Sequence, residues 1–460
     1  MSAPSRMRRE SDSLGTVEVP ADAYWGVHTF RARENFPVSG TPIGRHGALV
    51  RSLAVVKQAA ARANRDLGLL TAEQAEAIET ACERIRGGEL HDEFCVDVVQ
   101  GGAGTSTNMN ANEVIANAAL ERLGHERGRY DVIHPIDDVN RSQSTNDVYP
   151  TAIRLAVVEM VQALIPELSR LAGAFTERSE EFAAIRKVGR TQLQDAVPMT
   201  LGDEFAAFAV AVREDVQRLE ETVPLLLECN MGATAIGTGV TAPPGFREAV
   251  VARLRELTGL PVTPAAHLFE ATWDAGGFLH ASAMLRRSAV KLSKICNDLR
   301  LLSSGPQAGL SEIRLPVRQA GSSIMPGKVN PVIPEVVNQI AFAVIGSDVT
   351  IAFAAEGGQL QLNAFEPIIA QSLLQSTGWL TQGARVLREL CVEGIEANAP
   401  LLEHRVAGSV GAVTALLPVI GYDAATSAAK HALATGAPVA ESVARFARIS
   451  AEEAERLLAR

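Results

Sequence analysis

Cysteine is scarce in this 460-residue sequence, and long uncharged apolar runs are missing from it. The five cysteines are scattered and show no paired C-x-x-C spacing, which argues against disulfides and a zinc site and favours reduced thiols. No run of about 18 uncharged apolar residues occurs, so we expect no membrane-spanning helix. The basic first residues are not followed by an apolar segment, so we expect no secretory signal. These absences predict a soluble, cytoplasmic protein.

Positive charge is also in short supply. The sequence has 43 Lys and Arg against 53 Asp and Glu, a formal net charge of -10. This balance argues against nucleic acid or an anionic membrane surface as a partner. An anionic substrate must then be attracted by a local site. The length and a 47% hydrophobic content are sufficient for a large core in two or three domains.

The most informative stretch is GSSIMPGKVNP, residues 321–331. Its two glycines permit unusual backbone angles and close ligand approach, and its two prolines restrict the alternatives. Hydroxyl, ammonium and amide groups within one loop would suit a small carboxylate. On composition alone, an ordinary surface turn is an equally good interpretation. The polar side chains concerned are those of Ser322, Ser323, Lys328 and Asn330.

Two further clusters of short polar side chains precede helical segments. Residues 101–112, GGAGTSTNMNAN, lead into the helix-like EVIANAALERLG. Residues 134–150 contain Ser144, Thr145 and Asn146 ahead of a long helical segment. Backbone N–H groups at a helix start favour anions, although the same residue types are also common helix caps.

A fourth cluster, residues 189–199 with the sequence GRTQLQDAVPM, lies between two long helical segments. Thr191 and Gln192 can hydrogen-bond a carboxylate there. Arg190 or Asp195 could equally hold a turn.

Together these segments resemble the aspartase/fumarase superfamily, lyases that remove a group β to a carboxylate and release fumarate. GSSIMPGKVNP is similar to the signature loop of that family, and the other clusters are similar to its GTSxNMNxNE, SQSTND and GRT(H/Q)LQDA segments. The amino-terminal LGTVEVPADAYWGVHTFRARENF also resembles the family. The resemblance implies a small dicarboxylate substrate, no cofactor and no metal.

The resemblance also implies individual roles. Ser322 corresponds to the base that removes a proton, and Lys328 lies in the same loop as a fixed positive charge. A carboxylate that gains a second negative charge during the reaction would be surrounded by polar groups, and the leaving ammonia would be held by others. The implied substrate-binding residues are Thr105, Ser144, Thr145, Asn146, Thr191, Gln192, Ser323, Met325 and Asn330.

Gln192 bears on the choice of substrate. Fumarases usually carry histidine at this place, and an amide has no acid–base chemistry near neutral pH. The resemblance therefore favours the aspartase branch, which implies reversible deamination of L-aspartate to fumarate and ammonia. Fumarate hydratase is the alternative, because Trp25 and Asp138 are fumarase-like. A catalytically silent structural relative is less favoured, because the residues of the loop are intact.

Helical periodicity predicts an all-α fold. Residues 1–46 are expected as an extended arm and loops, and Thr71 with Gln74 predicts a capping box for a helix that ends near Arg86. Several long segments are apolar nearly all round, so we expect a helix bundle that is buried between subunits. The long helices are predicted at 150–182, 199–228, 270–303 and 331–356.

The family resemblance implies three domains and a homotetramer in which three chains share each active site. The predicted divisions are an amino-terminal, mainly helical domain, a central bundle that carries the signature loop, and a small carboxyl-terminal helical domain. Their boundaries are 1–142, 143–395 and 396–460.

Overall fold

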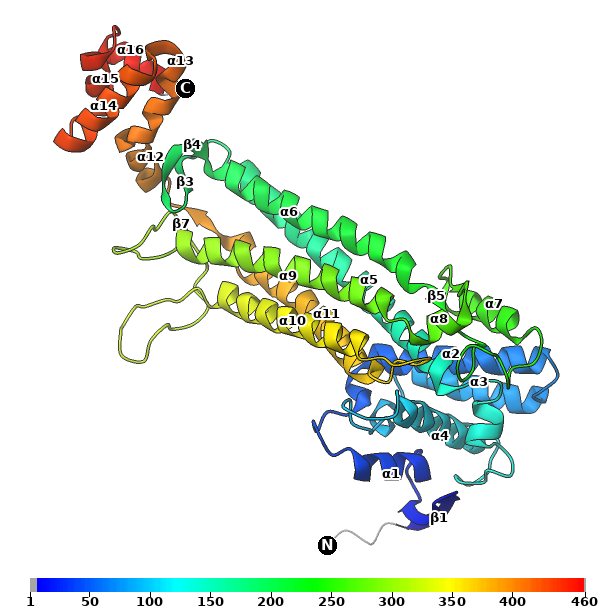
Figure 1. The fold of residues 1–460 in the computed structure, drawn as a ribbon. Helices are drawn as coiled ribbons and strands as arrows, with labels where there is room; N and C mark the ends of the chain where they lie inside the picture. The colour runs from blue at the N-terminus through cyan, green and yellow to red at the C-terminus, as the bar shows by residue number, and fades with distance from the viewer. Residues whose placement is uncertain (1–5, 459–460) are drawn as a thin grey trace. The chain divides into compact units, whose positions relative to one another are not determined.

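Helices dominate the computed structural model, which describes residues 6–458 (Figure 1). The all-α class is therefore confirmed, and the strands of the described residues form four small two-stranded sheets. Residue contacts divide the chain into two compact units that alternate along the sequence. Unit 1 comprises Met1–Pro166, Gln217–Ala289 and Ile340–Thr381, and unit 2 comprises Glu167–Val216, Val290–Gln339 and Gln382–Arg460. The three-part division at 142 and 395 stays a prediction.

The helices and strands have the following bounds. The α-helices are α1 Val27–Asn35, α2 Gly47–Asp66, α3 Ala72–Arg86, α4 Thr105–Arg122, α5 Thr145–Glu181, α6 Leu201–Thr222, α7 Phe246–Thr258, α8 Leu268–Trp273, α9 Gly276–Leu302, α10 Val332–Glu356, α11 Glu366–Leu390, α12 Ala399–Gly408, α13 Leu417–Ile420, α14 Tyr422–Thr435, α15 Val439–Phe446 and α16 Ala451–Leu458. The strand pairs are β1 Met7–Asp12 with β2 Gly15–Pro20, β3 Arg186–Thr191 with β4 Gln194–Thr200, β5 Glu228–Cys229 with β6 Thr263–Pro264, and β7 Ile313–Arg314 with β8 Glu396–Ala397.

The amino-terminal segment is more ordered than the sequence predicted. Strands β1 and β2 form an antiparallel hairpin, and α1 follows where loops were expected. The residue before α1 does not cap the helix with its side chain. Instead, the carboxylate of Glu113 in α4 accepts the N–H groups of Gly26, His28 and Thr29. A helix start that is stabilised by a residue far along the chain leaves no local signal in the sequence.

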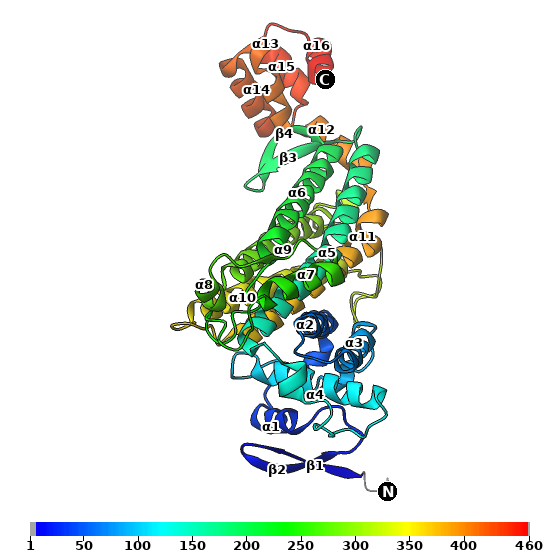
Figure 2. The same cartoon turned by 90° about the vertical axis from the view of Figure 1, so that its right-hand side faces the viewer.

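Helices α2, α3 and α4 pack together in unit 1, and Figure 2 shows α2 and α3 side by side. The predicted capping box is confirmed: the Thr71 side chain accepts the Gln74 N–H, and the Gln74 side chain accepts the Thr71 N–H. Helix α3 ends at Arg86, as predicted.

The predicted long helices are present with shifted boundaries. Helix α5 begins at Thr145 rather than Pro150. Ser144 Oγ accepts the Asn146 N–H in its first turn, and Asp147 Oδ1 accepts the N–H of Ser144 just before the helix. Helix α6 ends at Thr222, and a 3₁₀ helix follows it from Val223 to Leu226. The predicted helix at 270–303 is interrupted between α8 and α9.

Aromatic side chains form part of the core of unit 2. Phe175 and Phe182 of α5 meet Phe205 and Phe208 of α6 at ring-centroid separations between 5.3 and 6.2 Å. All four are buried. Edge-to-face packing of this kind adds to the hydrophobic contribution of the buried rings.

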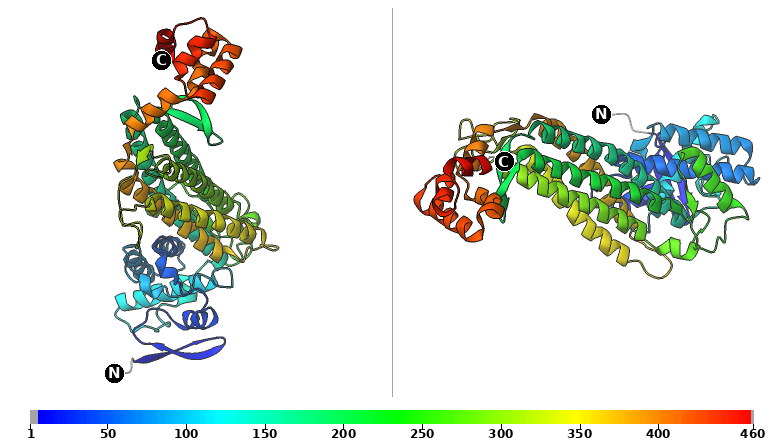
Figure 3. Two further views of the ribbon diagram at one scale, coloured as in Figure 1. Left: turned by 90° about the vertical axis from the view of Figure 1, so that its left-hand side faces the viewer. Right: turned by 90° about the horizontal axis from the view of Figure 1, so that it is seen from above.

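The carboxyl-terminal helices α12–α16 lie in unit 2 (orange to red in Figure 3), so residues 396–460 are helical as predicted. Helix α12 forms where the sequence NAPLLEHRV was expected to be a connector. Residues 410–458 surround a small apolar core in which alanine is prominent, including Ala425, Ala428 and Ala432. Small side chains of this kind let short helices approach closely.

Two helices, α5 and α10, are long and apolar enough to cross a membrane by length and composition alone. In the most apolar stretch of α5, 72% of the residues are buried within the chain, which is typical of a core helix in a soluble protein. In α10 the corresponding share is 33%, and Phe342, Val349 and Phe353 are exposed. Helix α10 therefore presents an apolar face that this chain does not itself cover.

Candidate functional site

Thr105 is the first residue of α4, as its polar neighbourhood predicted. Its side chain is exposed, and it follows Gly104, which has a φ of 84° and is buried. A Cβ on Gly104 would lie 2.2 Å from the Tyr149 ring, so only glycine fits here. The Thr105 hydroxyl therefore lies exposed at a helix start, a position that suits an anion. The Thr105 and Thr107 N–H groups already donate to the Gly102 carbonyl and to Gln100 Oε1, so the hydroxyl is the group offered to a ligand.

Ser144, Thr145 and Asn146 lie at the start of α5, close to α4. The Asn108 side chain of α4 donates to Thr145 Oγ1 over 3.1 Å, which joins the two helix starts. Ser144 Oγ accepts the Asn146 N–H, and Asp147 Oδ1 accepts the Ser144 N–H. The structure thus brings two of the predicted clusters together within unit 1 and orients them by hydrogen bonds.

A loop for which no role was predicted also contacts this cluster. The side-chain amide of Asn146 donates to the Ala235 carbonyl over 2.7 Å. Asp147 Oδ2 accepts the N–H groups of Gly232 and Thr234 at 3.2 and 2.9 Å. The only local signal for this loop was its glycine-rich sequence NMGATAIGTG, which predicts a turn but no ligand contact.

Two buried ionisable side chains, Asp147 and Lys57, belong to the hydrogen-bond network around this cluster. Burial raises the pKa of Asp147 to about 7, although the three N–H groups that it accepts oppose this. Burial lowers the pKa of Lys57 to about 7, and its ammonium donates to Asn140 Oδ1 over 2.7 Å. Asn140 Oδ1 also accepts the Asn108 amide, so the network reaches the start of α4.

The signature loop closes on itself in unit 2. The Gly321 N–H donates to the Lys328 carbonyl over 2.7 Å, and the Asn330 amide donates to the Gly321 carbonyl over 2.9 Å. A Cβ on Gly321 would lie 2.7 Å from the Lys328 carbonyl oxygen, so the closure requires glycine. One N–H of the Asn330 side-chain amide is therefore used to hold the loop, and its second N–H is left to donate to a ligand.

Ser322 has a distinctive environment within this loop. Its Oγ accepts the N–H groups of Ile324 and Met325 at 3.2 and 3.0 Å. Two N–H donors aimed at one hydroxyl oxygen stabilise its deprotonated form. The Lys328 side chain is exposed, and no hydrogen bond or ion pair involves its ammonium among the described residues. The ammonium is therefore available to an anion.

Thr191 and Gln192 lie at the tip of the β3–β4 hairpin, and both are exposed. Gln192 and Leu193 form the turn with φ values of 54° and 62°. Non-glycine residues adopt this left-handed conformation at a cost of about 1–2 kcal/mol each. Strain of this kind is typical of binding and catalytic sites.

The predicted site residues thus form two groups. Thr105, Ser144, Thr145 and Asn146 lie in unit 1, and the loop and hairpin residues lie in unit 2. Within the described part of unit 2, no hydrogen bond joins the loop to the hairpin. Across residues 6–458, no group of three or more His, Cys, Asp or Glu side chains could hold a metal ion.

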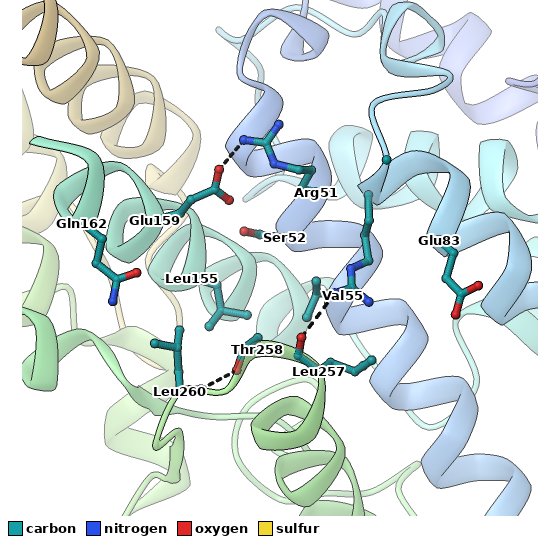
Figure 4. Close-up of a pocket in the computed structure, with 12 residues that line it drawn as sticks. Arg51, Ser52, Val55, Glu83, Leu155, Glu159, Gln162, Leu257, Thr258 and Leu260 are labelled. Atoms are coloured by element: carbon teal, nitrogen blue, oxygen red, sulfur yellow. Dashed lines mark hydrogen bonds and ion pairs between the residues drawn. The ribbon is translucent and has the colours of Figure 1, made fainter.

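A cavity of about 480 Å³ lies elsewhere in unit 1, between α2, α3, α5 and the end of α7 (Figure 4). Val55 and Leu155 are among the residues that line it. Arg51 at its rim is paired with Glu159, and Arg86 donates to a backbone carbonyl. None of the predicted site residues lines it. Because its two arginines already have partners within the chain, the cavity offers little to an anionic substrate.

Comparisons with known proteins agree on one family. The family model described as "Lyase" matches residues 15–346, and the one described as "Fumarase C C-terminus" matches residues 413–459. An aspartate ammonia-lyase of Pseudomonas aeruginosa is 56% identical over 96% of this chain and 94% of its own length. An aspartate ammonia-lyase of Escherichia coli is 52% identical over 95% of this chain and 92% of its own length.

Two solved structures show the same fold. A "fumarate lyase:delta crystallin" from Brucella melitensis superposes with a TM-score of 0.96 at 53% identity, covering 98% of both chains. A class II fumarase from Schistosoma mansoni superposes with a TM-score of 0.94 at 34% identity, also over 98% of both chains.

Proposed function

This chain belongs to the lyase family that its sequence resembles, the aspartase/fumarase superfamily, and from that premise we propose that it is an aspartate ammonia-lyase. It is a carbon–nitrogen lyase that converts L-aspartate to fumarate and ammonia. The observation that carries this assignment is the contrast in identity. The chain is 56% identical to an aspartate ammonia-lyase over nearly its whole length, but 34% identical to a class II fumarase.

Ser322 is the proposed base. Removing a proton from a carbon next to a carboxylate is difficult, because that carbon is a very weak acid. The N–H groups of Ile324 and Met325 support a Ser322 alkoxide, which takes the proton from C3 of aspartate. The C–H electron pair moves into the adjacent carboxylate, which then carries a second negative charge.

That doubly charged carboxylate is the species the site must stabilise. The Lys328 ammonium is the proposed counter-charge, since it has no described partner of its own. Hydrogen bonds from the loop and hairpin would complete its surroundings. The residues proposed for them are Thr191, Gln192, Ser323 and Asn330, and Met325 is proposed to contact the substrate through its side chain.

Loss of ammonia completes the reaction. The electron pair returns from the carboxylate to form the C2–C3 double bond, and the C2–N bond breaks. The amino group and the neighbouring carboxylate are proposed to bind to Thr105, Ser144, Thr145 and Asn146. Asn146 suits this role because its amide nitrogen is held by Ala235, which leaves its oxygen to accept from an ammonium.

We also propose a homotetramer in the cytoplasm, in which three chains share each active site. The exposed apolar face of α10 supports assembly, because an isolated chain seldom leaves such a face to water. All five cysteines are free thiols, which supports a reducing compartment.

Ultraviolet absorbance of fumarate tests the function directly. Purified protein is supplied with L-aspartate and L-malate in parallel, and ammonia is measured alongside. Fumarate from aspartate with equimolar ammonia supports the proposal. Fumarate formed from malate alone would identify the protein as a fumarate hydratase instead. No fumarate from either substrate would contradict both assignments.

A further inference from the structure

Glu312 is a buried carboxylate that contacts three cationic side chains in unit 2. Its side chain is 1% exposed and lies 2.6 Å from Arg190, 2.8 Å from Lys187 and 3.2 Å from Arg405. Lys187 is itself 2% exposed and also pairs with Glu204 at 2.5 Å. A buried charge is tolerated only when it is paired, so these contacts depend on one another.

The charge state of Glu312 agrees with this arrangement. Burial pushes the pKa of Glu312 upward, but hydrogen bonds from Arg190 and Lys187 hold it below the usual value of a glutamic acid. The carboxylate is therefore ionised at neutral pH, and removing a cation would leave a buried charge with fewer partners.

Two of these cations belong to the β3–β4 hairpin. Lys187 and Arg190 are both in strand β3, and Arg190 directly precedes Thr191. The hairpin tip is strained, because Gln192 and Leu193 both have positive φ. A strained tip persists only when the surrounding structure holds it in place, and the Glu312 contacts hold its base.

The third cation comes from the carboxyl-terminal helices. Arg405 lies in α12, which packs against β3, and it also donates to the Leu310 carbonyl over 2.7 Å. A second close approach lies nearby: a Cβ on Gly411 would come within 2.0 Å of the Ala196 carbonyl of β4. The carboxyl-terminal helices therefore contact both strands of the hairpin.

We propose that Glu312 is a positioning residue that ties the Thr191–Gln192 hairpin to α12, so that the carboxyl-terminal helices set the geometry of the hairpin's substrate contacts. This inference rests on the proposed function for its effect on turnover. It gives the carboxyl-terminal helices a role in the reaction, although the sequence shows no chemistry in them.

Substitution of Arg405 tests the link with less risk of unfolding than substitution of Glu312, because Lys187 and Arg190 still neutralise the Glu312 carboxylate. Arg405→Met is compared with Arg405→Lys, which retains the charge, and with Arg388→Met. Arg388 is a matched control in unit 2, since it is an arginine of similar exposure, 17% against 29%, with carboxylate partners of its own.

The first measurement is amide hydrogen exchange of residues 190–195 in the protein without substrate. We expect Arg405→Met to speed this exchange by about tenfold, since a local opening would become easier, and to leave α5 and α6 unchanged. The second measurement is kcat/KM for aspartate, which we expect to fall by about 10- to 100-fold through misplaced contacts. Arg405→Lys should recover part of both effects, and Arg388→Met should cause neither.

Unchanged hairpin exchange in Arg405→Met would overturn the mechanical link. Faster exchange with an unchanged kcat/KM would overturn the effect on substrate contacts. If the unsubstituted protein does not turn over aspartate, the proposed function fails, and the exchange comparison still decides the link on its own.

Discussion

At the scale of single residues, Ser322 stands out because its oxygen is the meeting point of two backbone N–H groups. We expect Ser322→Ala to lower kcat by about 10³-fold or more, since it removes the proposed base. Aspartate turnover with circular dichroism of the same sample measures this.

Ser323→Ala is the matched comparison for that substitution. The Ser323 hydroxyl takes part in no described hydrogen bond within residues 6–458 and lies next to Ser322 in the loop. Its loss should therefore cost less than that of Ser322. Near-normal turnover by Ser322→Ala would show that Ser322 is not the base.

Glu366 is a second residue whose buried environment leads to a prediction, in this case for the pH dependence of stability. Its side chain is buried at the start of α11, and burial raises its pKa from 4.5 to about 8, against a smaller opposite effect of Arg154. The folded protein therefore keeps this proton up to about pH 8, whereas the unfolded chain loses it near pH 4.5. Deprotonation opposes folding, so the stability that this group contributes is complete at low pH and is lost as the pH rises toward 8.

We expect Glu366→Gln to flatten the fall in stability between pH 5.5 and 7.5, because it removes a slope of up to about 1.4 kcal/mol per pH unit. Thermal midpoints at fixed protein concentration measure this. Glu403→Gln, an exposed change in α12, serves as the control and should keep the original slope. Identical slopes in both variants would show that Glu366 does not titrate in this range.

At the scale of an element, the start of α4 depends on a close approach between Gly104 and Tyr149. Gly104→Ala would place a methyl group 2.2 Å from a fully buried ring. We expect it to destabilise the protein by about 1–3 kcal/mol through overpacking, beyond the cost of its positive φ. It should also weaken substrate binding, since Thr105 is the next residue.

Gly124→Ala separates these two costs. Gly124 has a similar φ of 79° and nothing within 4 Å of an added Cβ. Urea unfolding of the two variants side by side should show the larger loss for Gly104→Ala. Equal losses would mean that the Tyr149 contact adds nothing.

At the scale of the whole molecule, the apolar face of α10 predicts assembly. Phe353 is 72% exposed in the single chain, and Phe342 and Val349 lie on the same helix. We expect four chains in solution by light scattering, because burying this face would recover its hydrophobic free energy. Phe353→Asp should weaken that assembly.

Leu433→Asp is the matched control for that prediction, since Leu433 is 71% exposed but lies in α14. It should leave the assembly intact. A monomer in the unsubstituted protein would contradict the proposed tetramer and the sharing of active sites.

The sequence by itself determined the helical class, the long helices and the position of each polar cluster at a helix start or between helices. Periodicity and caps are local properties, so the Thr71–Gln74 box and the end of α3 at Arg86 could be predicted. The family also follows from the sequence, because GSSIMPGKVNP is an ordered string rather than a loose pattern.

Only the tertiary structure decided which distant residues meet. The start of α1 rests on Glu113, the start of α5 rests partly on the loop at Gly232, and the hairpin rests on Glu312. Each contact joins residues that are remote in sequence and buried in the fold. Hydrogen bonds and ion pairs of this kind leave no periodic or local signal, because their partners are chosen by packing.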